Sequence, residues 1–203
     1  DRDSFVRRVA RFISLKSFIP RMFKVVTPEM KVLISAAAVQ LTFGLPEICL
    51  QHFRRIIIYP DAYYSTVTKQ MHKGEVNPQA GAIVLSWKSF LSGYAHPDDS
   101  YNLGLHEMAH ALELENLIEN KEYAFFPEEV WADFRQEALQ ISEGIKSGQH
   151  DFFRNYAGTN EKEFFAVAVE NFFERAGAFQ QRFPQLYSIL VLLLNQDPLK
   201  KTT

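Results

Sequence analysis

The sequence predicts an α+β fold that is mostly helical and contains a small sheet. Segments with apolar residues at helical spacing make up most of the chain. Short β-branched runs are confined to residues 54–87 and come shortly before the most apolar of the helical segments. With 203 residues, 47% of them hydrophobic, the chain can bury a substantial core, and we expect a single domain spanning residues 1–203.

Two helices are expected in the first part of the chain, over residues 5–44. Phe5 to Ile19 shows amphipathic spacing with its arginines outward, and Pro20 would end that helix. Thr27-Pro28-Glu29 combines a helix N-cap, a first-turn proline and a first-turn acid. The second helix is therefore predicted to run to about Phe43 and to stop at Gly44.

Strands are expected next. Arg54 to Tyr59 is a β-branched run followed by Pro-Asp, which predicts a buried strand. Tyr63 to Met71 is a less distinct strand candidate, with a turn predicted at Lys73-Gly74-Glu75. Gly81 to Trp87 predicts a further strand, close before the apolar helical segment.

Helices fill the rest of the predicted fold. Asp98-Asp99-Ser100 can cap a helix that starts near Tyr101. Pro127 to Ser147 reads as the next helix, and an aromatic segment and a turn with a cap at Asn160 follow it. Glu161 to Arg175 and Pro184 to Leu194 predict two more apolar helices.

The segment Leu103 to Leu112 contains the pattern HExxH, formed by His106, Glu107 and His110. On a helix the two histidines lie on one face, one turn apart, so that both imidazoles can reach one tetrahedral cation. Glu107 can then act on a water at the open side of the metal, as in zinc hydrolases. The alternative is a pair of core histidines bonded to backbone carbonyls, with Glu107 in an ion pair.

A catalytic zinc site needs a third protein ligand. The extension of the motif that supplies a third histidine is absent, because Glu113 and Asn116 stand at its positions. A carboxylate from a second helix is the other common solution. Glu163 and Glu170 are seven residues apart on a very apolar helix, so we expect Glu163 to bind the metal and Glu170 to hydrogen-bond a ligand. Alternatively, both face solvent on a polar stripe with Glu174.

The remaining acids of this half of the chain lie in polar surroundings, where we expect water to solvate them. They are Glu113, Glu115, Glu119, Glu122, Glu128, Glu129, Glu137 and Glu143. The strand before the motif suggests a place for substrate, because an edge strand beside a metal can pair with an extended peptide. The predicted peptide-binding residues are Ala82, Ile83, Val84, Leu85 and Ser86. An interior strand without a free edge is the alternative.

Composition excludes several other classes of function. A net charge of -2 predicts no direct binding to nucleic acid, and the single cysteine, Cys49, permits neither an internal disulfide nor a thiolate metal site. No apolar run is long enough for a membrane span and no signal peptide is visible, so we expect a cytoplasmic protein, although an anchor upstream of Asp1 would not be seen. The first 24 residues are basic, which suits either an acidic surface or a solvated helix face.

Several segments carry a family resemblance. NLGLHEMAHALELE, NYAGTNEKEFFAVAVENFFE, RFPQLY and NQDPL resemble the Mlc titration factor A family of zinc peptidases, also known as DgsA anti-repressors. The second segment is also similar to the metallopeptidase domain of anthrax lethal factor. The resemblance implies a zincin-like fold, one Zn2+ on His106, His110 and Glu163, Glu107 as general base, and Tyr156 as a stabiliser of the reacting oxygen. The catalytic part would span residues 54–199.

Two functions follow from the motif and the resemblance together. The first is a zinc-dependent metallopeptidase that hydrolyses peptide bonds with a zinc-activated water, with aminopeptidase-type activity on short peptides. The second is a protein that binds a transcriptional repressor, with zinc in a regulatory or structural role. A structural site would need a fourth protein ligand, and His96 is the nearest further imidazole in the sequence.

Overall fold

The computed structural model describes residues 1–65, 69–118 and 125–200. Its helices are α1 (Arg2–Leu15), α2 (Pro28–Thr42), α3 (Trp87–Ala95), α4 (Leu103–Ile118), α5 (Glu128–Lys146), the 3-10 helix η1 (Asn155–Gly158), α6 (Glu161–Glu174), α7 (Ala176–Arg182) and α8 (Pro184–Leu194). Its strands are β1 (Ser17–Pro20), β2 (Arg55–Tyr59), β3 (Tyr63–Tyr64), β4 (Met71–His72), β5 (Gly74–Asn77) and β6 (Ala82–Ser86).

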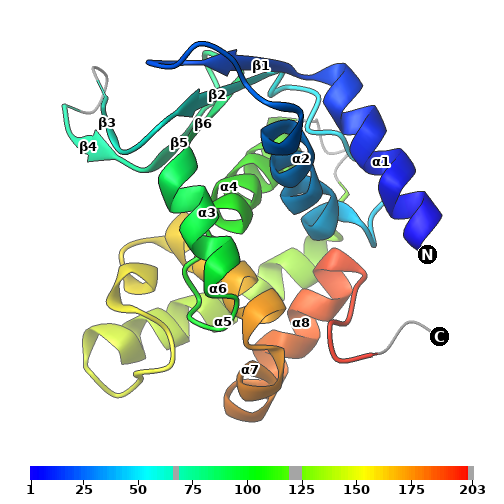
Figure 1. The fold of residues 1–203 in the computed structure, drawn as a ribbon. Helices are drawn as coiled ribbons and strands as arrows, with labels where there is room; N and C mark the ends of the chain where they lie inside the picture. Colours follow the sequence, from blue (N-terminus) through cyan, green and yellow to red (C-terminus); the bar gives the residue numbers. More distant parts are fainter. Residues whose placement is uncertain (66–68, 119–124, 201–203) are drawn as a thin grey trace.

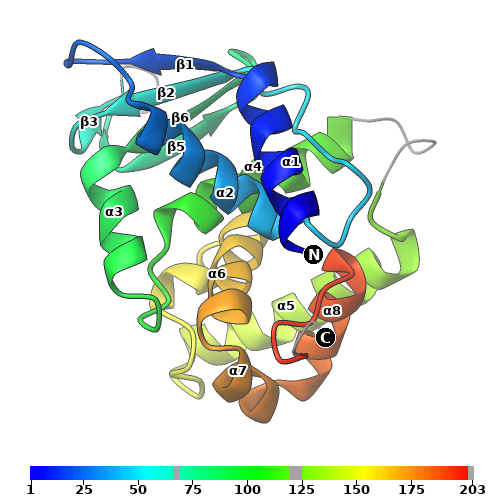
Figure 2. The ribbon, with the colours of Figure 1, turned by 45° about the vertical axis from the view of Figure 1, so that its right-hand side comes forward.

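The elements form two parts with α4 between them (Figure 1). The sheet, α1 and α2 make up the upper part of the view, and α5 to α8 make up the lower part. Helix α4 packs against β5 and β6 on one side and against α6 on the other. Turning the molecule shows the same arrangement (Figure 2). The α+β fold with mostly helical content and a small sheet is thereby confirmed.

The main sheet has the order β1-β2-β6-β5. Strands β1, β2 and β6 are parallel, and β5 pairs antiparallel with β6 as an edge strand. The predicted strands at residues 54–59 and 81–87 are confirmed as β2 and β6. Ile56, Ile58, Ile83 and Leu85 are completely buried, so alternate positions of both strands enter the core.

The first predicted helix is too long. Helix α1 ends at Leu15, and residues 17–20 form β1 beside β2. The Ser17 N–H donates to the Arg54 carbonyl, which starts this pairing. A contact with residues far along the chain thus overrides the local helical spacing of Phe18 and Ile19. Pro20 fits because an edge strand tolerates a missing donor.

The segment before β6 also differs from the prediction. Residues 63–71 do not form one strand: β3 and β4 pair with each other as a short antiparallel hairpin, and residues 66–68 lie outside the described residues. The predicted turn at Lys73-Gly74-Glu75 is instead the start of β5. The chain reverses between β5 and β6, where Gly81 has a positive φ of 55° and its N–H donates to the Pro78 carbonyl.

Two short helices, α3 and α7, have no counterpart in the prediction. Helix α4 starts later than expected, because the side chain of Asn102 and not the 98–100 segment accepts the hydrogen bond of Leu105 N–H. Thr27 and Asn160 are the N-caps of α2 and α6, as predicted. The other long helices have nearly the predicted bounds.

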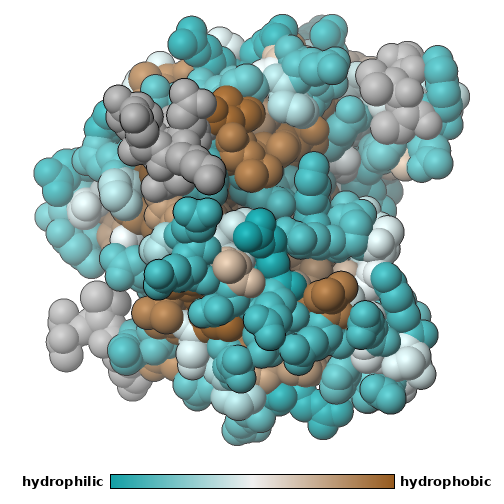
Figure 3. Space-filling view, turned by 180° about the vertical axis from the view of Figure 1, so that it is seen from behind, coloured by the Kyte–Doolittle hydropathy of each residue, from teal (hydrophilic) through white to brown (hydrophobic). Residues whose placement is uncertain are grey.

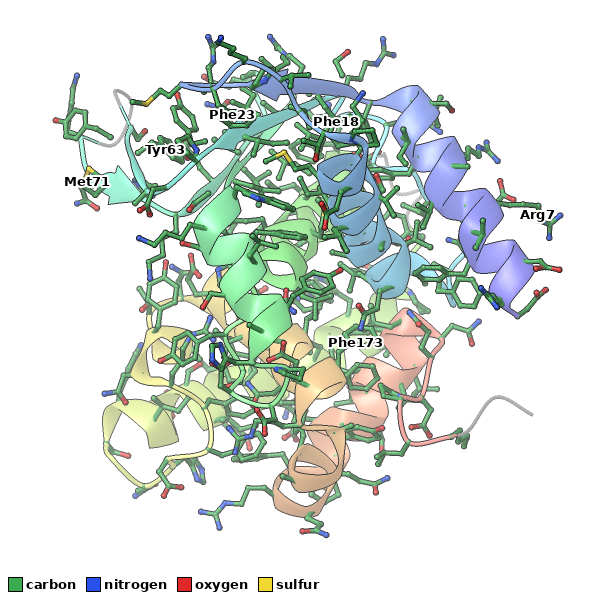
Figure 4. The ribbon with its side chains drawn as sticks, in the orientation of Figure 1. Arg7, Phe18, Phe23, Tyr63, Met71 and Phe173 are labelled. Atoms are coloured by element: carbon green, nitrogen blue, oxygen red, sulfur yellow. The ribbon has the colours of Figure 1, made fainter. Side chains whose placement is uncertain are left out.

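The surface is mainly hydrophilic when it is seen from behind, with separate hydrophobic patches (Figure 3). Arg7 extends from α1 into solvent, and Met71 lies at the outer hairpin of β3 and β4 (Figure 4). No helix among residues 1–65, 69–118 and 125–200 combines the length and the apolar character needed to cross a membrane.

Candidate metal centre

Two histidines of α4 and one glutamate of α6 converge where the two helices pack. The Nε2 atoms of His106 and His110 are 3.1 Å apart. Oε2 of Glu163 lies 3.2 Å from the first of these nitrogens and 3.4 Å from the second. The structure therefore brings the three sequence-predicted ligands together, with their donor atoms in a nearly equilateral triangle.

This triangle fits a divalent cation. A tetrahedral zinc site with bonds of about 2.0–2.1 Å has edges of roughly 3.3–3.4 Å between neighbouring ligand atoms. Oε2 of Glu163 is buried and accepts no hydrogen bond from the residues that the structure describes. A buried carboxylate oxygen without a donor is expensive unless a cation satisfies it. Two imidazole nitrogens and one carboxylate oxygen are a donor set that zinc accepts.

The charges around the triangle are strongly coupled. Burial raises the pKa of the Glu163 carboxyl, but the imidazoles of His106 and His110 outweigh burial and hold this pKa well below its usual range. Burial lowers the pKa of His106, whereas the nearby carboxylates of Glu163 and Glu170 outweigh burial and raise the pKa to about 10. A cation entering the triangle would thus replace a proton that the site otherwise holds between its imidazoles and carboxylates.

Glu170 lies directly behind His106. Its Oε1 is 2.7 Å from His106 Nδ1, the ring nitrogen that faces away from the triangle. The side chain is 1% exposed, so the alternative of a solvated polar stripe does not hold for Glu170. Its other contacts are the backbone N–H of Asn102 and the guanidinium of Arg154.

Glu107 lies under the edge strand β5. It is 5% exposed, and its side chain fills the space that a Cβ atom would need at Gly74. Burial raises the pKa of the Glu107 carboxyl above its ordinary value, which moves it in the direction that favours a base working near neutral pH. The positive partners His106 and His110 counteract part of this effect.

A cleft of about 750 Å³ opens in front of these groups. Its lining includes His106, Glu107 and Tyr156, together with the segment from Met71 to Gly74. Tyr156 is 51% exposed, and its ring centroid lies 6.2 Å from that of His106. Burial of its hydroxyl and the charge of Glu163 raise the pKa of Tyr156 to about 12, so it keeps its proton as a donor.

The prediction of a free strand edge at Ala82–Ser86 is wrong, and the alternative of an interior strand is confirmed. Strand β6 is hydrogen-bonded to β2 on one side and to β5 on the other, and all five residues are buried. The edge beside α4 belongs to β5, which sequence reasoning assigned to a turn. The physical reason is the reversal at residues 78–81, which inserts one more strand between β6 and the cleft.

Other residues at the site were missed or misjudged from the sequence. Arg154 and Gly74 were not among the predicted site residues. They are recognised only because they lie next to α6 and the HExxH motif in the folded structure. Glu113 and Glu115 were expected in solvent, but they are 4% and 2% exposed. Their place on the apolar helix α4 was the available signal. His96 is exposed and lies outside the triangle, and Glu119 and Glu122 lie outside the described residues.

Comparison with known proteins gives a consistent result. The family model described as glucose-regulated metallo-peptidase M90 matches residues 1–194. Mlc titration factor A from Serratia proteamaculans is 27% identical over 214 residues, which cover 94% of this chain and 78% of that protein.

Two further relatives show similar coverage. Mlc titration factor A from Yersinia pestis is 26% identical, over 99% of this chain and 80% of its own length. The uncharacterized protein slr2042 from Synechocystis is also 26% identical, over 98% of this chain and 78% of its own length. The resemblance to the Mlc titration factor A family is thereby confirmed. Since the family model covers nearly the whole sequence, the chain belongs to the glucose-regulated metallo-peptidase M90 family, whose members are metallopeptidases.

Proposed function

We propose that this protein is a zinc-dependent metallopeptidase in which His106, His110 and Glu163 hold one zinc ion. The observation that carries the proposal is the triangle of three donor atoms, 3.1–3.4 Å apart, with the buried Glu107 beside it in an open cleft. Within the described residues no fourth histidine, cysteine or carboxylate joins this cluster. That favours a catalytic site over a structural one, because structural zinc sites are closed by protein ligands.

The chain's own groups suit peptide hydrolysis. When bound, zinc supplies a Lewis acid that polarises a carbonyl and makes water more acidic. The Glu107 carboxylate takes the proton of the attacking water and delivers it to the leaving nitrogen. The Tyr156 hydroxyl, protonated near neutral pH, donates to the oxygen on which negative charge develops. Glu170 holds His106 from behind, so that Nε2 keeps its lone pair toward the metal.

The peptide is proposed to lie along β5. The Ser86 N–H donates to the Lys73 carbonyl, and the register places Glu75 and Asn77 at the next pairs of this ladder. Because inward and outward groups alternate along an antiparallel strand, Gly74 and Val76 direct their backbone groups away from β6. An extended substrate can pair with these groups above Glu107. The cleft volume of about 750 Å³ suits short peptides, and aminopeptidase-type cleavage is the proposed activity.

A second candidate is binding of a transcriptional repressor, with zinc as a regulatory or structural ion. The observation that favours it is the name Mlc titration factor A carried by the relatives from Serratia and Yersinia. A partner of that kind would act in the cytoplasm. Both functions can coexist, because a repressor could bind outside the cleft.

Metal analysis together with peptide-library digestion tests the proposal. Purified protein should carry one zinc per chain and should cleave peptides, and a chelator should abolish the cleavage. H106A should lose the metal, whereas E107Q should keep it and lose about 10²- to 10⁴-fold in turnover, the usual contribution of a general base. Stoichiometric zinc in H106A would refute the ligand assignment, and unchanged hydrolysis by E107Q would remove Glu107 from the mechanism.

A further inference from the structure

Arg154, which directly precedes η1, forms a two-pronged ion pair with Glu170. Its Nη2 donates to Oε1 of Glu170 at 2.5 Å, and its Nη1 donates to Oε2 at 3.1 Å. Nη1 also donates to the Ser100 carbonyl, and the guanidinium carbon lies 4.6 Å from the centre of the Tyr101 ring. The side chain is 15% exposed, so most of this arrangement is shielded from water.

Glu170 receives donors from three residues. The Asn102 N–H at the start of α4 donates to Oε2 at 2.7 Å, and His106 Nδ1 lies 2.7 Å from Oε1. With the two bonds from Arg154, both carboxylate oxygens have two partners each. The carboxylate therefore has one orientation, and that orientation defines where the ring of His106 can lie.

The distances also indicate that Nδ1 of His106 acts as a hydrogen-bond donor. Arg154 Nη2 lies 3.3 Å from His106 Nδ1, and both nitrogens lie closer than that to the same oxygen, Oε1 of Glu170. Two donors that converge on one acceptor explain this geometry. Nδ1 of His106 then donates to Glu170, and Nε2 is directed at the donor triangle, where a metal would take the place of its proton.

We propose that Arg154 is a positioning residue of the metal centre, which acts on His106 through Glu170. This inference rests on the proposed zinc site. Arg154 holds both oxygens of Glu170, and Glu170 fixes the orientation of the His106 ring so that Nε2 faces the donor triangle. Both terminal nitrogens of Arg154 are engaged with protein acceptors, so its role is orientation of a ligand and not recognition of a substrate carboxylate.

Zinc affinity measured by competition with a chelator tests the proposal without any substrate. R154M should weaken zinc binding by roughly 10- to 100-fold, the usual effect of removing a group that orients a ligand. R154K keeps the charge but loses the fork, so it should weaken binding less, and it replaces R154M should that variant not fold. The matched control is R175M, since Arg175 also stacks on an aromatic ring, that of Phe152, and donates to a backbone carbonyl, but does not contact Glu170.

A double-mutant cycle with E170Q tests the route of the effect. If Arg154 acts through Glu170, the zinc affinity of the double variant R154M/E170Q should be about equal to that of the single variant with the lower zinc affinity. Full additivity, or zinc affinity of R154M within about twofold of R175M, would overturn the proposal. Thermal unfolding of the metal-free variants separates a general loss of stability from a loss of zinc affinity.

The two proposals fail separately. A wild-type protein that binds zinc but cleaves no peptide would refute the peptidase and leave Arg154 as a positioning residue of the zinc site. If the wild type binds zinc and R154M binds it with the same affinity, only the role of Arg154 would be refuted.

Discussion

Gly74 and Glu107 share one small volume between the edge strand and α4. A Cβ atom at position 74 would lie well inside contact distance of the Glu107 side chain, including its Oε1. Nothing in the backbone requires glycine there, since Gly74 does not have a positive φ. Glu107, the proposed base, can therefore occupy its position only because residue 74 has no side chain.

G74A should move Glu107 and leave the metal ligands in place. Because a misplacement of about 1 Å can reduce a rate by 10²-fold, we expect kcat to fall by roughly 10- to 100-fold while zinc stoichiometry is unchanged. Steady-state kinetics and metal analysis measure both quantities. The matched control is G177A in α7, where an added Cβ meets no atom within 4 Å. Equal kcat in G74A and G177A would show that Glu107 does not depend on this space.

Glu113 is a buried acid one turn after His110. It is 4% exposed, and its Oε2 accepts no hydrogen bond within the described part of the chain. Burial raises the pKa of Glu113 to about 7, although His110 and Lys162 oppose this shift. The folded state therefore prefers the neutral acid, and its stability contribution is full below the ordinary pKa of 4.5 and is lost as pH rises through about 7.

E113Q should accordingly become more stable relative to the wild type as pH rises. The difference in free energy of unfolding between the two proteins should shift by about 1–3 kcal/mol in favour of E113Q between pH 5 and pH 8. Urea unfolding of both proteins at the two pH values, with a chelator present, measures the shift. A difference that is the same at both pH values would show that Glu113 ionises as it does in the unfolded chain.

At the scale of elements, the centre depends on the packing of α4 against α6. Helix α4 contributes two of the proposed ligands and α6 contributes the third. Each helix begins at an asparagine cap: Asn102 accepts from Leu105 N–H, and Asn160 accepts from Glu163 N–H at 3.0 Å. The cap of α6 thus holds the backbone of the third ligand itself. The N-cap of α6 and the position of the proposed metal ligand Glu163 are therefore linked.

N160A and T27A separate these two effects. Both substitutions remove an N-cap and should reduce the free energy of unfolding by about 1 kcal/mol. Only N160A should also weaken zinc binding, by several-fold, because Thr27 caps α2 and its side chain accepts from Met30 N–H, away from the donor triangle. Chemical unfolding and chelator competition on both variants provide the comparison. Equal zinc affinity in the two variants would mean that the first turn of α6 is held without its cap.

At the scale of the whole molecule, the donor triangle joins α4, which packs on the sheet, to the helices of the other half. Zinc that binds only the folded protein should stabilise it by about 2.7 kcal/mol at a free concentration 100-fold above its Kd. For a chain of this size that corresponds to a rise in Tm of roughly 5–10 °C. Thermal unfolding with and without zinc should show this rise in the wild type and not in H106A, and an equal rise in both would place the stabilising zinc elsewhere.

The division into N-terminal helices over 5–44 and a catalytic part over 54–199 stays a prediction.

The sequence by itself determined the long helices, two of the strands, and the residues that converge on the donor triangle. These features follow from local rules: the HExxH spacing places His106 and His110 on one face of any helix, and two acids on an apolar helix need a buried partner. The caps at Thr27 and Asn160 were predictable for the same reason, since a cap bonds to a backbone group three residues away.

Only the tertiary structure decided which strand lies at the edge, what surrounds the metal ligands and which acids are buried. Strand β1 forms by pairing with β2, far along the chain, so its residues Ser17–Pro20 were misassigned from local helical spacing. Strand β5 forms because the chain turns back onto β6, so the turn predicted at residues 73–75 is in fact the start of a strand. Arg154 donates to Glu170, 16 residues further along the chain, and Glu107 of α4 fills the space beside Gly74 of β5. Such contacts depend on how elements pack in space, and the side-chain periodicity of one segment carries no information about them.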